Sequence, residues 1–195
     1  MTEVRRVSQE WELEGIVALQ RANLRKNLSD SEAAQQGFLT AEYDLPYLRA
    51  MNAAAPSIIA VDQSQIVGYA LVATQPIRHG HPFIGALFQA IDPLLFRGQT
   101  FDKTPYVVVG QLCVGRHHRG QGLVQRLYQH FRESQQSEFH CAVTDIAREN
   151  VRSLRAHVNT GFRVIHSIAY EGRDWDIVVW DWRSNPATGE SASAL

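Results

Sequence analysis

The stretch from Gln111 to Tyr128, QLCVGRHHRGQGLVQRLY, joins an apolar strand to an amphipathic helix through a basic, glycine-rich turn. Gly120 and Gly122 let the backbone approach a ligand with no Cβ in the way. The first N–H groups of the following helix have no partner inside the helix and carry partial positive charge. Arg116 and Arg119 would add fixed cationic donors. The stretch therefore predicts a site for a diphosphate-bearing small molecule that needs no metal.

Length and composition predict a soluble globular protein. The chain has 195 residues, of which 45% are hydrophobic and 20% charged, as in ordinary soluble domains. The net charge of −1 argues against a nucleic-acid or anionic-membrane partner. No apolar run is long enough to span a bilayer, and no signal-peptide core begins the chain. Cys113 and Cys141 are interpreted as buried free thiols, with a disulfide left open, so we expect a cytoplasmic protein.

The order of predicted elements indicates an α/β (α+β) fold with at least one parallel strand pair across the glycine-rich helix. Helices are expected after Ser8, over 45–55, from Gly122 and over 150–160, and strands at 4–7, 57–61, 65–72, 106–114, 139–146, 162–170 and 175–182. We expect residues 1–183 to form one domain. It contains an insertion at about 75–104, with a helical segment within 83–96. Residues 184–195 are expected to form a flexible tail.

Two familiar phosphate loops do not fit the turn. A P-loop would need Lys-Ser/Thr after its second glycine, and a dinucleotide fingerprint would need a third glycine at position 125, which is Gln125. A helix that is merely started by glycines is the remaining structural alternative.

A second segment, Asn150 to Phe162 (NVRSLRAHVNTGF), follows the next strand. Together with Leu112 to Val124 it resembles the GNAT superfamily of N-acetyltransferases. In that family Arg/Gln-x-x-Gly-x-Gly/Ala follows one strand, and Asn, a short helix and Gly-Phe follow the next. In outline the resemblance covers residues 3–182. It implies a mixed, mostly antiparallel central sheet, a parallel strand pair splayed at the cofactor cleft, and helices on both faces.

The resemblance also implies that acetyl-CoA donates an acetyl group to a primary amine, which attacks the thioester directly. Val114 N–H would stabilise the thioester oxyanion. The other residues implied in cofactor binding are the strand backbone at Leu112, Cys113 and Val114 for pantetheine, the N–H groups of Arg119, Gly120, Gln121, Gly122, Leu123 and Val124 for pyrophosphate, and Asn150 with nearby Ser153.

This sequence departs from the family pattern at three places. Val124 replaces the last Gly/Ala of the turn, which at most weakens binding. His157 stands where many members have a tyrosine that protonates the CoA thiolate, and it is either the catalytic acid or a packing residue. The strand at 106–114 carries no carboxylate, only Gln111 near the place of the usual base. Asp145, a residue of the insertion or bulk water remain candidates for the base.

Other chemistry is not favoured. Cys113 lies in a hydrophobic strand and is expected to pack rather than react. The histidines at 79, 81, 117 and 118 have no ligand spacing, so no metal is expected. Apolar Val151, Leu154 and Val158 are expected to form the inner face of the last helix.

The acceptor is expected to lie between residues 27–47 and the insertion, and to be a small amine with an apolar part. A protein N-terminal or lysine acetyltransferase, a catalytically silent acyl-CoA-binding module and a structural domain without cofactor are alternatives. Because similar proteins are often dimers, a homodimer is a further option.

Overall fold

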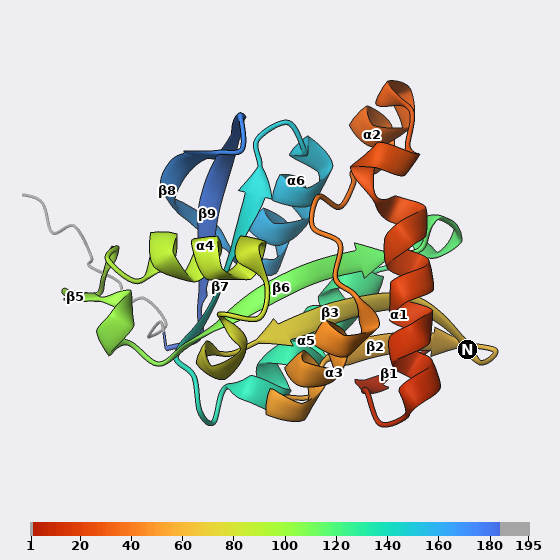
Figure 1. The fold of residues 1–195 in the computed structure, drawn as a ribbon, viewed down its shortest axis with the longest axis horizontal. Coiled ribbons are helices and arrows are strands. Elements are labelled where there is room, and N and C mark those ends of the chain that lie inside the picture. Colours follow the sequence, from red (N-terminus) through yellow and green to blue (C-terminus); the bar gives the residue numbers. More distant parts are fainter. Residues whose placement is uncertain (1, 184–195) are drawn as a thin grey trace, which may run out of the picture.

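The computed structural model describes residues 2–183, so the predicted tail at 184–195 lies outside the described residues. Among them, seven strands form one sheet in the order β1-β2-β3-β6-β7-β9-β8 (Figure 1). The strands are β1 (Glu3–Arg6), β2 (Ile58–Asp62), β3 (Gln65–Ala73), β6 (Tyr106–Val114), β7 (Cys141–Ala147), β8 (Arg163–Tyr170) and β9 (Arg173–Asp181). β2 and β3 pair antiparallel, which confirms the predicted strand pair.

Helices cover both faces of the sheet, and each face has its own apolar core. The helices are α1 (Glu10–Asn23), α2 (Asp30–Gln36), α3 (Leu45–Ala54), α4 (Pro82–Ile91), α5 (Leu123–Gln135) and α6 (Val151–Thr160). Residues of α1, α3 and α4 pack in one core, and residues of α5 pack in the other, where α6 adds Leu154. Strand residues alternate between the two cores, as a period of two requires. No helix within residues 2–183 is long and apolar enough to cross a membrane.

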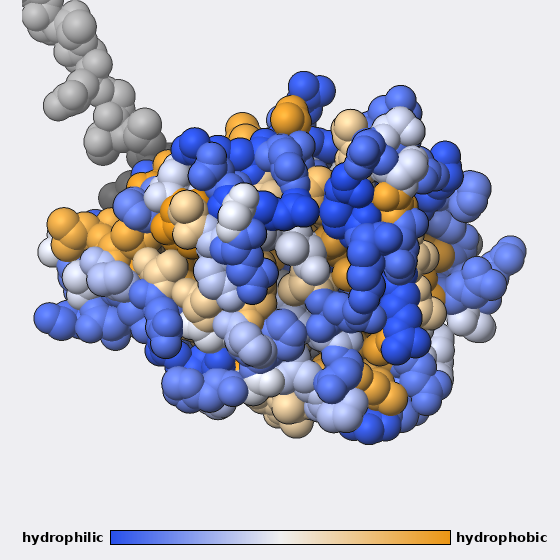
Figure 2. Space-filling model, turned by 45° about the horizontal axis from the view of Figure 1, so that its top comes forward, coloured by the Kyte–Doolittle hydropathy of each residue, from blue (hydrophilic) through white to orange (hydrophobic). Residues whose placement is uncertain are grey.

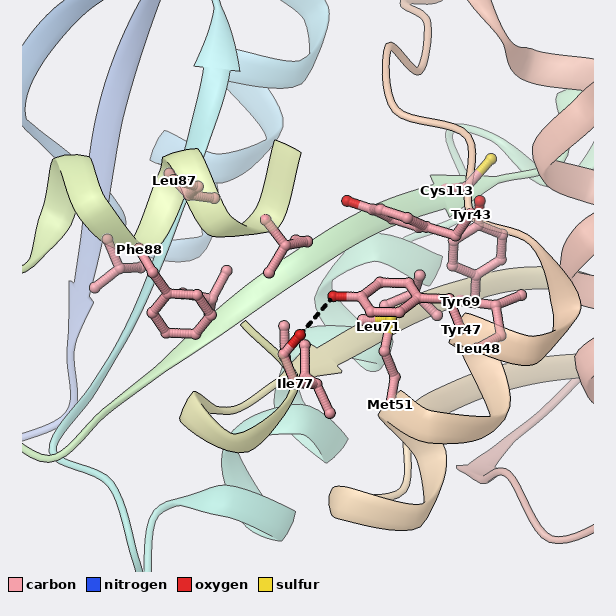
Figure 3. Close-up of a cluster of buried hydrophobic side chains, with 14 of the residues drawn as sticks. Tyr43, Tyr47, Leu48, Met51, Tyr69, Leu71, Ile77, Leu87, Phe88 and Cys113 are labelled. Carbon is pink, nitrogen blue, oxygen red and sulfur yellow. Dashed lines mark hydrogen bonds between the residues drawn. The ribbon is translucent and has the colours of Figure 1, made fainter. Parts of the chain in front are cut away.

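The segment at 75–104 has secondary structure of its own. It contains the short 3-10 turn η2 (Gln75–Ile77), α4, the two-residue strands β4 (Leu95–Phe96) and β5 (Gln99–Thr100), and the turn η3 (Phe101–Lys103). The helix expected within 83–96 ends at Ile91, because Pro93 lacks the N–H that a further turn needs. Tyr47 Oη donates to Ile77 O at 3.2 Å (Figure 3). This bond ties the segment to α3.

The fold opens between β6 and β7. Every neighbouring pair in the seven-stranded sheet is antiparallel except this one, which is parallel. The two strands pair only over Tyr106–Val108 and Cys141–Val143, although β6 continues to Val114 and β7 to Ala147. Thr144 Oγ1 donates to Val109 O at 2.9 Å, just beyond the last pair. Past that point the strands diverge (Figure 1), so their backbone groups face a gap.

Candidate active site

The glycine-rich turn adopts the left-handed conformation at two positions. Gly120 has φ +75° and Gly122 has φ +71°, and a Cβ on either residue would meet no protein atom within 4 Å. Glycine is therefore required for its backbone angle rather than for space on the protein side. Gly122 is the N-cap of α5 and provides no side-chain cap. The first N–H groups of α5 consequently point into the turn without a protein side chain to satisfy them.

The last residues of β6 present alternate backbone groups to the gap. Gly115 N–H donates to Val67 O at 2.8 Å, which places that residue's donor on the β3 edge. The backbone N–H and C=O groups of successive strand residues point to alternate edges of the strand. Those of Cys113 therefore also point toward β3, whereas those of Leu112 and Val114 point away from it. Val114 O accepts from Arg119 Nε at 2.8 Å on that far side. The Val114 N–H therefore lies on the cleft edge, as does that of Leu112.

The turn, the end of β6 and the start of α6 enclose a cleft of about 410 Å³. Of the residues that the sequence assigns to the cofactor, the cleft is lined by Leu112, Cys113, Val114, Arg119, Gly120, Gly122, Leu123, Val124, Asn150 and Ser153. Gln121 is not among the lining residues, because its side chain turns outward and Nε2 donates to His117 O at 3.1 Å. The structure therefore brings the two sequence motifs together around one cavity.

The Arg119 side chain differs from its expected role as a cationic donor to a ligand. Nη2 donates to Asn23 Oδ1 at 2.6 Å, and Nη1 donates to Gln36 O at 3.1 Å. Together with the bond to Val114 O, these contacts engage the guanidinium with protein acceptors on α1, α2 and β6. The Arg119 side chain therefore connects the turn to α1 and α2.

Helix α6 faces the cleft with residues that sequence reasoning missed. Val151 and Val158 are 57% and 51% exposed, so the prediction is wrong for these two valines, whereas Leu154 packs against the core as predicted. The cleft is instead lined by Arg152, Arg155, Ala156 and Asn159, which follow helical spacing. The signal was present in the sequence, because two arginines three residues apart share a face with a following asparagine. The valines of the same helix form a more obvious apolar pattern, which masks this signal.

Asn150 holds the start of α6 and the edge of the cleft. Its Oδ1 accepts from Ser153 N–H at 3.3 Å, which makes it the N-cap of the helix. Its Nδ2 donates to Phe38 O at 2.9 Å. Asn150 therefore holds the main chain at Phe38, which also lines the cleft.

A second, smaller cavity of about 80 Å³ continues from the cleft. Phe38, Leu39, Leu112, Asn150 and Ser153 line both cavities. Further in, the small cavity is lined by Gly110 and Gln111 of β6, Asp145 of β7, Phe83 of α4 and Trp175 of β9. It occupies the gap where β6 and β7 diverge.

Asp145 is a titratable residue of the small cavity whose pKa is shifted toward neutral pH. It lies on β7 two residues beyond the last residue that pairs with β6. Burial raises the pKa of its carboxyl to about 7, because a charged carboxylate loses solvation there. Within residues 2–183, no cationic side chain forms an ion pair with it. A carboxyl that titrates near neutral pH inside a cavity has the properties of a general base.

His157 also borders the small cavity, and both of its ring nitrogens are engaged. Nδ1 lies 2.8 Å from Ser153 O, so it is the protonated nitrogen and donates to that carbonyl. Nε2 lies 2.6 Å from the hydroxyl of Tyr128, which donates to it. Burial lowers the pKa of the His157 imidazole to about 4, which keeps the ring neutral at physiological pH. This arrangement favours the packing role over the catalytic one.

Gln111 and Cys113 have structural contacts. Gln111 Nε2 donates to Ala41 O at 2.8 Å and its Oε1 accepts from Tyr69 Oη at 2.6 Å, so it connects β6 to the loop before α3. Cys113 and Cys141 are free and buried. Burial raises the pKa of the Cys113 thiol to about 12, so the nucleophilic thiolate is disfavoured. Figure 3 shows Cys113 in the cluster of buried side chains that also contains Tyr43 and Tyr69. Within residues 2–183 no cluster of three His, Cys, Asp or Glu residues could hold a metal ion.

Comparison with solved structures shows the same fold at low sequence identity. yncA of Salmonella typhimurium, with its cofactor acetyl-CoA, is 17% identical and has a TM-score of 0.61, covering 97% of this chain and 99% of that one. NAA60 of Arabidopsis thaliana in complex with acetyl-CoA is 13% identical with a TM-score of 0.62, covering 93% and 99%. Ribosomal-protein-alanine N-acetyltransferase of Brucella melitensis is 19% identical with a TM-score of 0.59, covering 92% and 99%.

At the level of sequence, no curated protein matches the chain. The model of the acetyltransferase (GNAT) family, however, matches residues 24–162, which is most of the chain. This range includes the glycine-rich turn, β6, β7 and α6. The chain therefore belongs to the GNAT acetyltransferase family and is an acyltransferase.

Proposed function

We propose that the protein transfers the acetyl group of acetyl-CoA to a primary amine by direct attack, with Asp145 as the general base. The observation that carries this proposal is the half-buried Asp145 carboxyl, which lines a cavity continuous with the cleft of the glycine-rich turn and whose pKa is raised to about 7. In this proposal the acetyl-CoA site borders β6 and the base lies on β7, which are the two strands that diverge.

The donor would bind along the larger cleft. The N–H groups at the start of α5 would hold the pyrophosphate, where the helix dipole favours negative charge. Arg152 and Arg155 of α6 would add positive charge beside it. The pantetheine arm would pair with the cleft edge of β6 at Leu112 and Val114, as an added strand does. This path leads the thioester to the small cavity.

At the thioester, the neutral amine attacks the carbonyl carbon and a C–N bond forms. The Val114 N–H donates to the developing oxyanion. The nitrogen becomes acidic as it bonds, and its proton passes to the Asp145 carboxylate, directly or through a water molecule. The C–S bond then breaks and the sulfur leaves as a thiolate. A CoA thiol is less acidic than Asp145, so the same proton returns from Asp145 to the sulfur and regenerates the base.

His157 is placed beside this step rather than in it. Its one ring proton is committed to Ser153 O, and its other nitrogen accepts from Tyr128. We assign it the role of holding α6 against α5, so that Asn150 and Ser153 stay at the cleft. In this scheme the thiolate receives its proton from Asp145, which removes the need for a separate acid.

The acceptor is proposed to be a small-molecule amine. The cavity beside Asp145 is narrow, and Phe83 of α4 and Trp175 of β9 close one side of it with ring centroids 5.4 Å apart. The segment at 75–104, which carries Phe83, thus covers the acceptor side. The free, buried cysteines further support the cytoplasm as the compartment.

The test replaces Asp145 by asparagine, which keeps the shape and removes the titration. We expect D145N to lower kcat by about 10²–10⁴-fold, the range of general base catalysis, with acetyl-CoA affinity unchanged. Thiol release from a panel of amines measures kcat, and calorimetry measures donor binding. D174N, at an exposed carboxyl on the neighbouring strand β9, is the matched control and should keep full activity.

Two outcomes would contradict the proposal. Full activity of D145N would exclude Asp145 as the base. Tight acetyl-CoA binding by the native protein, with no thiol release on any amine or peptide, would instead favour the catalytically silent module.

A further inference from the structure

A third cavity, of about 360 Å³, borders the loop before α3, which also lines the small cavity. It is lined by Leu24, Arg25, Lys26, Thr40, Glu42 and Arg173. Thr40 also lines the small cavity that contains Asp145, so the two cavities adjoin at this residue. We call the third cavity the cationic pocket, because three of its six lining residues are positively charged.

The cations come from two parts of the chain. Arg25 and Lys26 lie in the 3-10 turn η1 (Arg25–Asn27) that follows α1, and Arg173 begins β9. The guanidinium groups of Arg25 and Arg173 both lie over the ring of Phe38, each 5.9 Å from its centroid. Phe38 in turn lines the two cavities of the active site. The ring therefore fixes both guanidiniums at the border of the site.

The acidic partners of these cations are exposed. Arg25 pairs with Asp30, whose side chain is 94% exposed, and Arg173 pairs with Glu149, which is 56% exposed. Lys26 and Arg21 both pair with Glu42, the one carboxylate in the lining. Exposed ion pairs contribute little net stability, so a ligand anion can replace Asp30 and Glu149 at small cost. The side of the molecule that carries α2 and the β8–β9 turn is mainly hydrophilic (Figure 2).

From this arrangement we propose that the cationic pocket binds an anionic group, a carboxylate or a phosphate, of the amine acceptor. The acceptor would place its amine beside Asp145 and its anion beside Arg25 and Arg173, with the connecting atoms passing Thr40. This inference rests on the proposed function and narrows it, because the substrate class becomes small-molecule amines that carry a negative charge at a fixed distance from the nitrogen. Guanidiniums suit this role, since they bind carboxylate and phosphate oxygens in pairs.

The experiment compares ω-amino carboxylic acids of increasing length with alkylamines of equal length as acceptors. We expect one length of amino acid to exceed its neutral partner in kcat/KM by about tenfold or more, as one good charge-assisted contact provides. R173Q should lower that kcat/KM by about tenfold, chiefly through KM, and leave the alkylamine rate and the KM for acetyl-CoA unchanged. E42Q, which removes the carboxylate of the lining, should increase the preference. K103Q, at an exposed lysine outside the pocket, is the charge control.

Binding is measured as well, by calorimetry of the best ω-amino acid with the CoA-saturated protein, so that the pocket is tested separately from turnover. Equal rates for amino acids and alkylamines, with binding indifferent to R173Q, would overturn the pocket and leave acetyl transfer standing. Anion binding that depends on Arg173, without thiol release on any amine, would overturn the proposed function and leave the pocket. If a peptide with an acidic side chain outpaced every amino acid, the small-molecule source would be wrong.

Discussion

The hydroxyl of Tyr128 on α5 donates to Nε2 of His157 on α6 at 2.6 Å, and both side chains are buried. This contact joins the helix that begins at the glycine-rich turn to the helix that begins at Asn150. Two sequence motifs that border the cofactor cleft are thereby held in register by one hydrogen bond between their helices.

Replacing His157 by phenylalanine is expected to destabilise the protein by about 1–3 kcal/mol, because the buried Tyr128 hydroxyl and Ser153 carbonyl lose their partner. We expect kcat to fall less than tenfold. Denaturant unfolding and steady-state thiol release measure the two effects. The H157F/Y128F double variant should recover part of the loss, since it leaves no orphaned hydroxyl. A loss of kcat of a thousandfold with unchanged stability would restore His157 as the catalytic acid.

The pH dependence of stability should show His157 and Asp145 acting in opposite directions. The depressed pKa of His157 means that the unfolded chain binds more protons between its ordinary pKa and about 4. The neutral His157 ring therefore favours the native state fully above pH 6.5, and this contribution to the free energy of unfolding is lost as the pH falls toward 4. The raised pKa of Asp145 means that the native state holds the extra proton, so that stability is lost as the pH rises from about 4 through 7.

D145N is therefore expected to be more stable than the native protein at pH 8 while it is less active. Urea unfolding at pH 5 and pH 8 measures this difference, which should shrink at the lower pH. In the native enzyme, kcat/KM should rise through an apparent pKa near 7. If kcat/KM of D145N still rose through the same apparent pKa, this pKa would belong to another group.

Gly122→Ala should weaken both the fold and donor binding. An L-residue at φ +71° costs about 1–2 kcal/mol, although the added Cβ meets no protein atom. The same Cβ would lie in the proposed path of the pyrophosphate, so the Kd for acetyl-CoA should also rise. Gly98→Ala is the matched control: it has φ +82°, has equally open surroundings and lies in the β4–β5 turn. It should lose similar stability and keep its Kd, and a Kd that rises equally in both variants would place the pyrophosphate elsewhere.

Arg119→Met should destabilise the protein by about 2 kcal/mol, because it removes charge-assisted bonds to Asn23, Gln36 and Val114. Lysine should restore little, since a single ammonium does not match the forked geometry that three separate acceptors require. Limited proteolysis would show earlier cleavage near α2. If lysine restored both stability and the KM for acetyl-CoA, the side chain would be acting as a simple charge toward the ligand.

Much of the fold could be predicted because its decisive signals are local. The strand at 106–114 is found with those bounds, and the helix expected at 45–55 ends at Ala54, before Pro56. The site was harder to predict where contacts cross the chain. The sequence predicts that Arg119 is a phosphate ligand. Its hydrogen-bond acceptors on Asn23 and Gln36 are far away in the sequence, so no local pattern indicates them.

The proposed base and the cleft face of α6 show the same limit of sequence-based prediction. Asp145 differs from other aspartates only through its burial between diverging strands, which no local pattern records. For α6, apolar periodicity indicated Val151 and Val158, because it assumes that the apolar side of a helix is the covered one. Here that helix borders the cleft with Arg152, Arg155 and Asn159, and of the predicted face only Leu154 packs against the core.

The divergence of β6 from β7 also bears on aggregation. Unpaired strand edges at the rim of a sheet recruit edges of other molecules, and proteins commonly block them with charges or prolines. In this chain the unpaired edges of Val109–Val114 and Thr144–Ala147 lie in the middle of the sheet, with Phe38 and α6 bordering the gap. These backbone donors therefore do not lie at the rim of the sheet, where the edge strands of other molecules could pair with them.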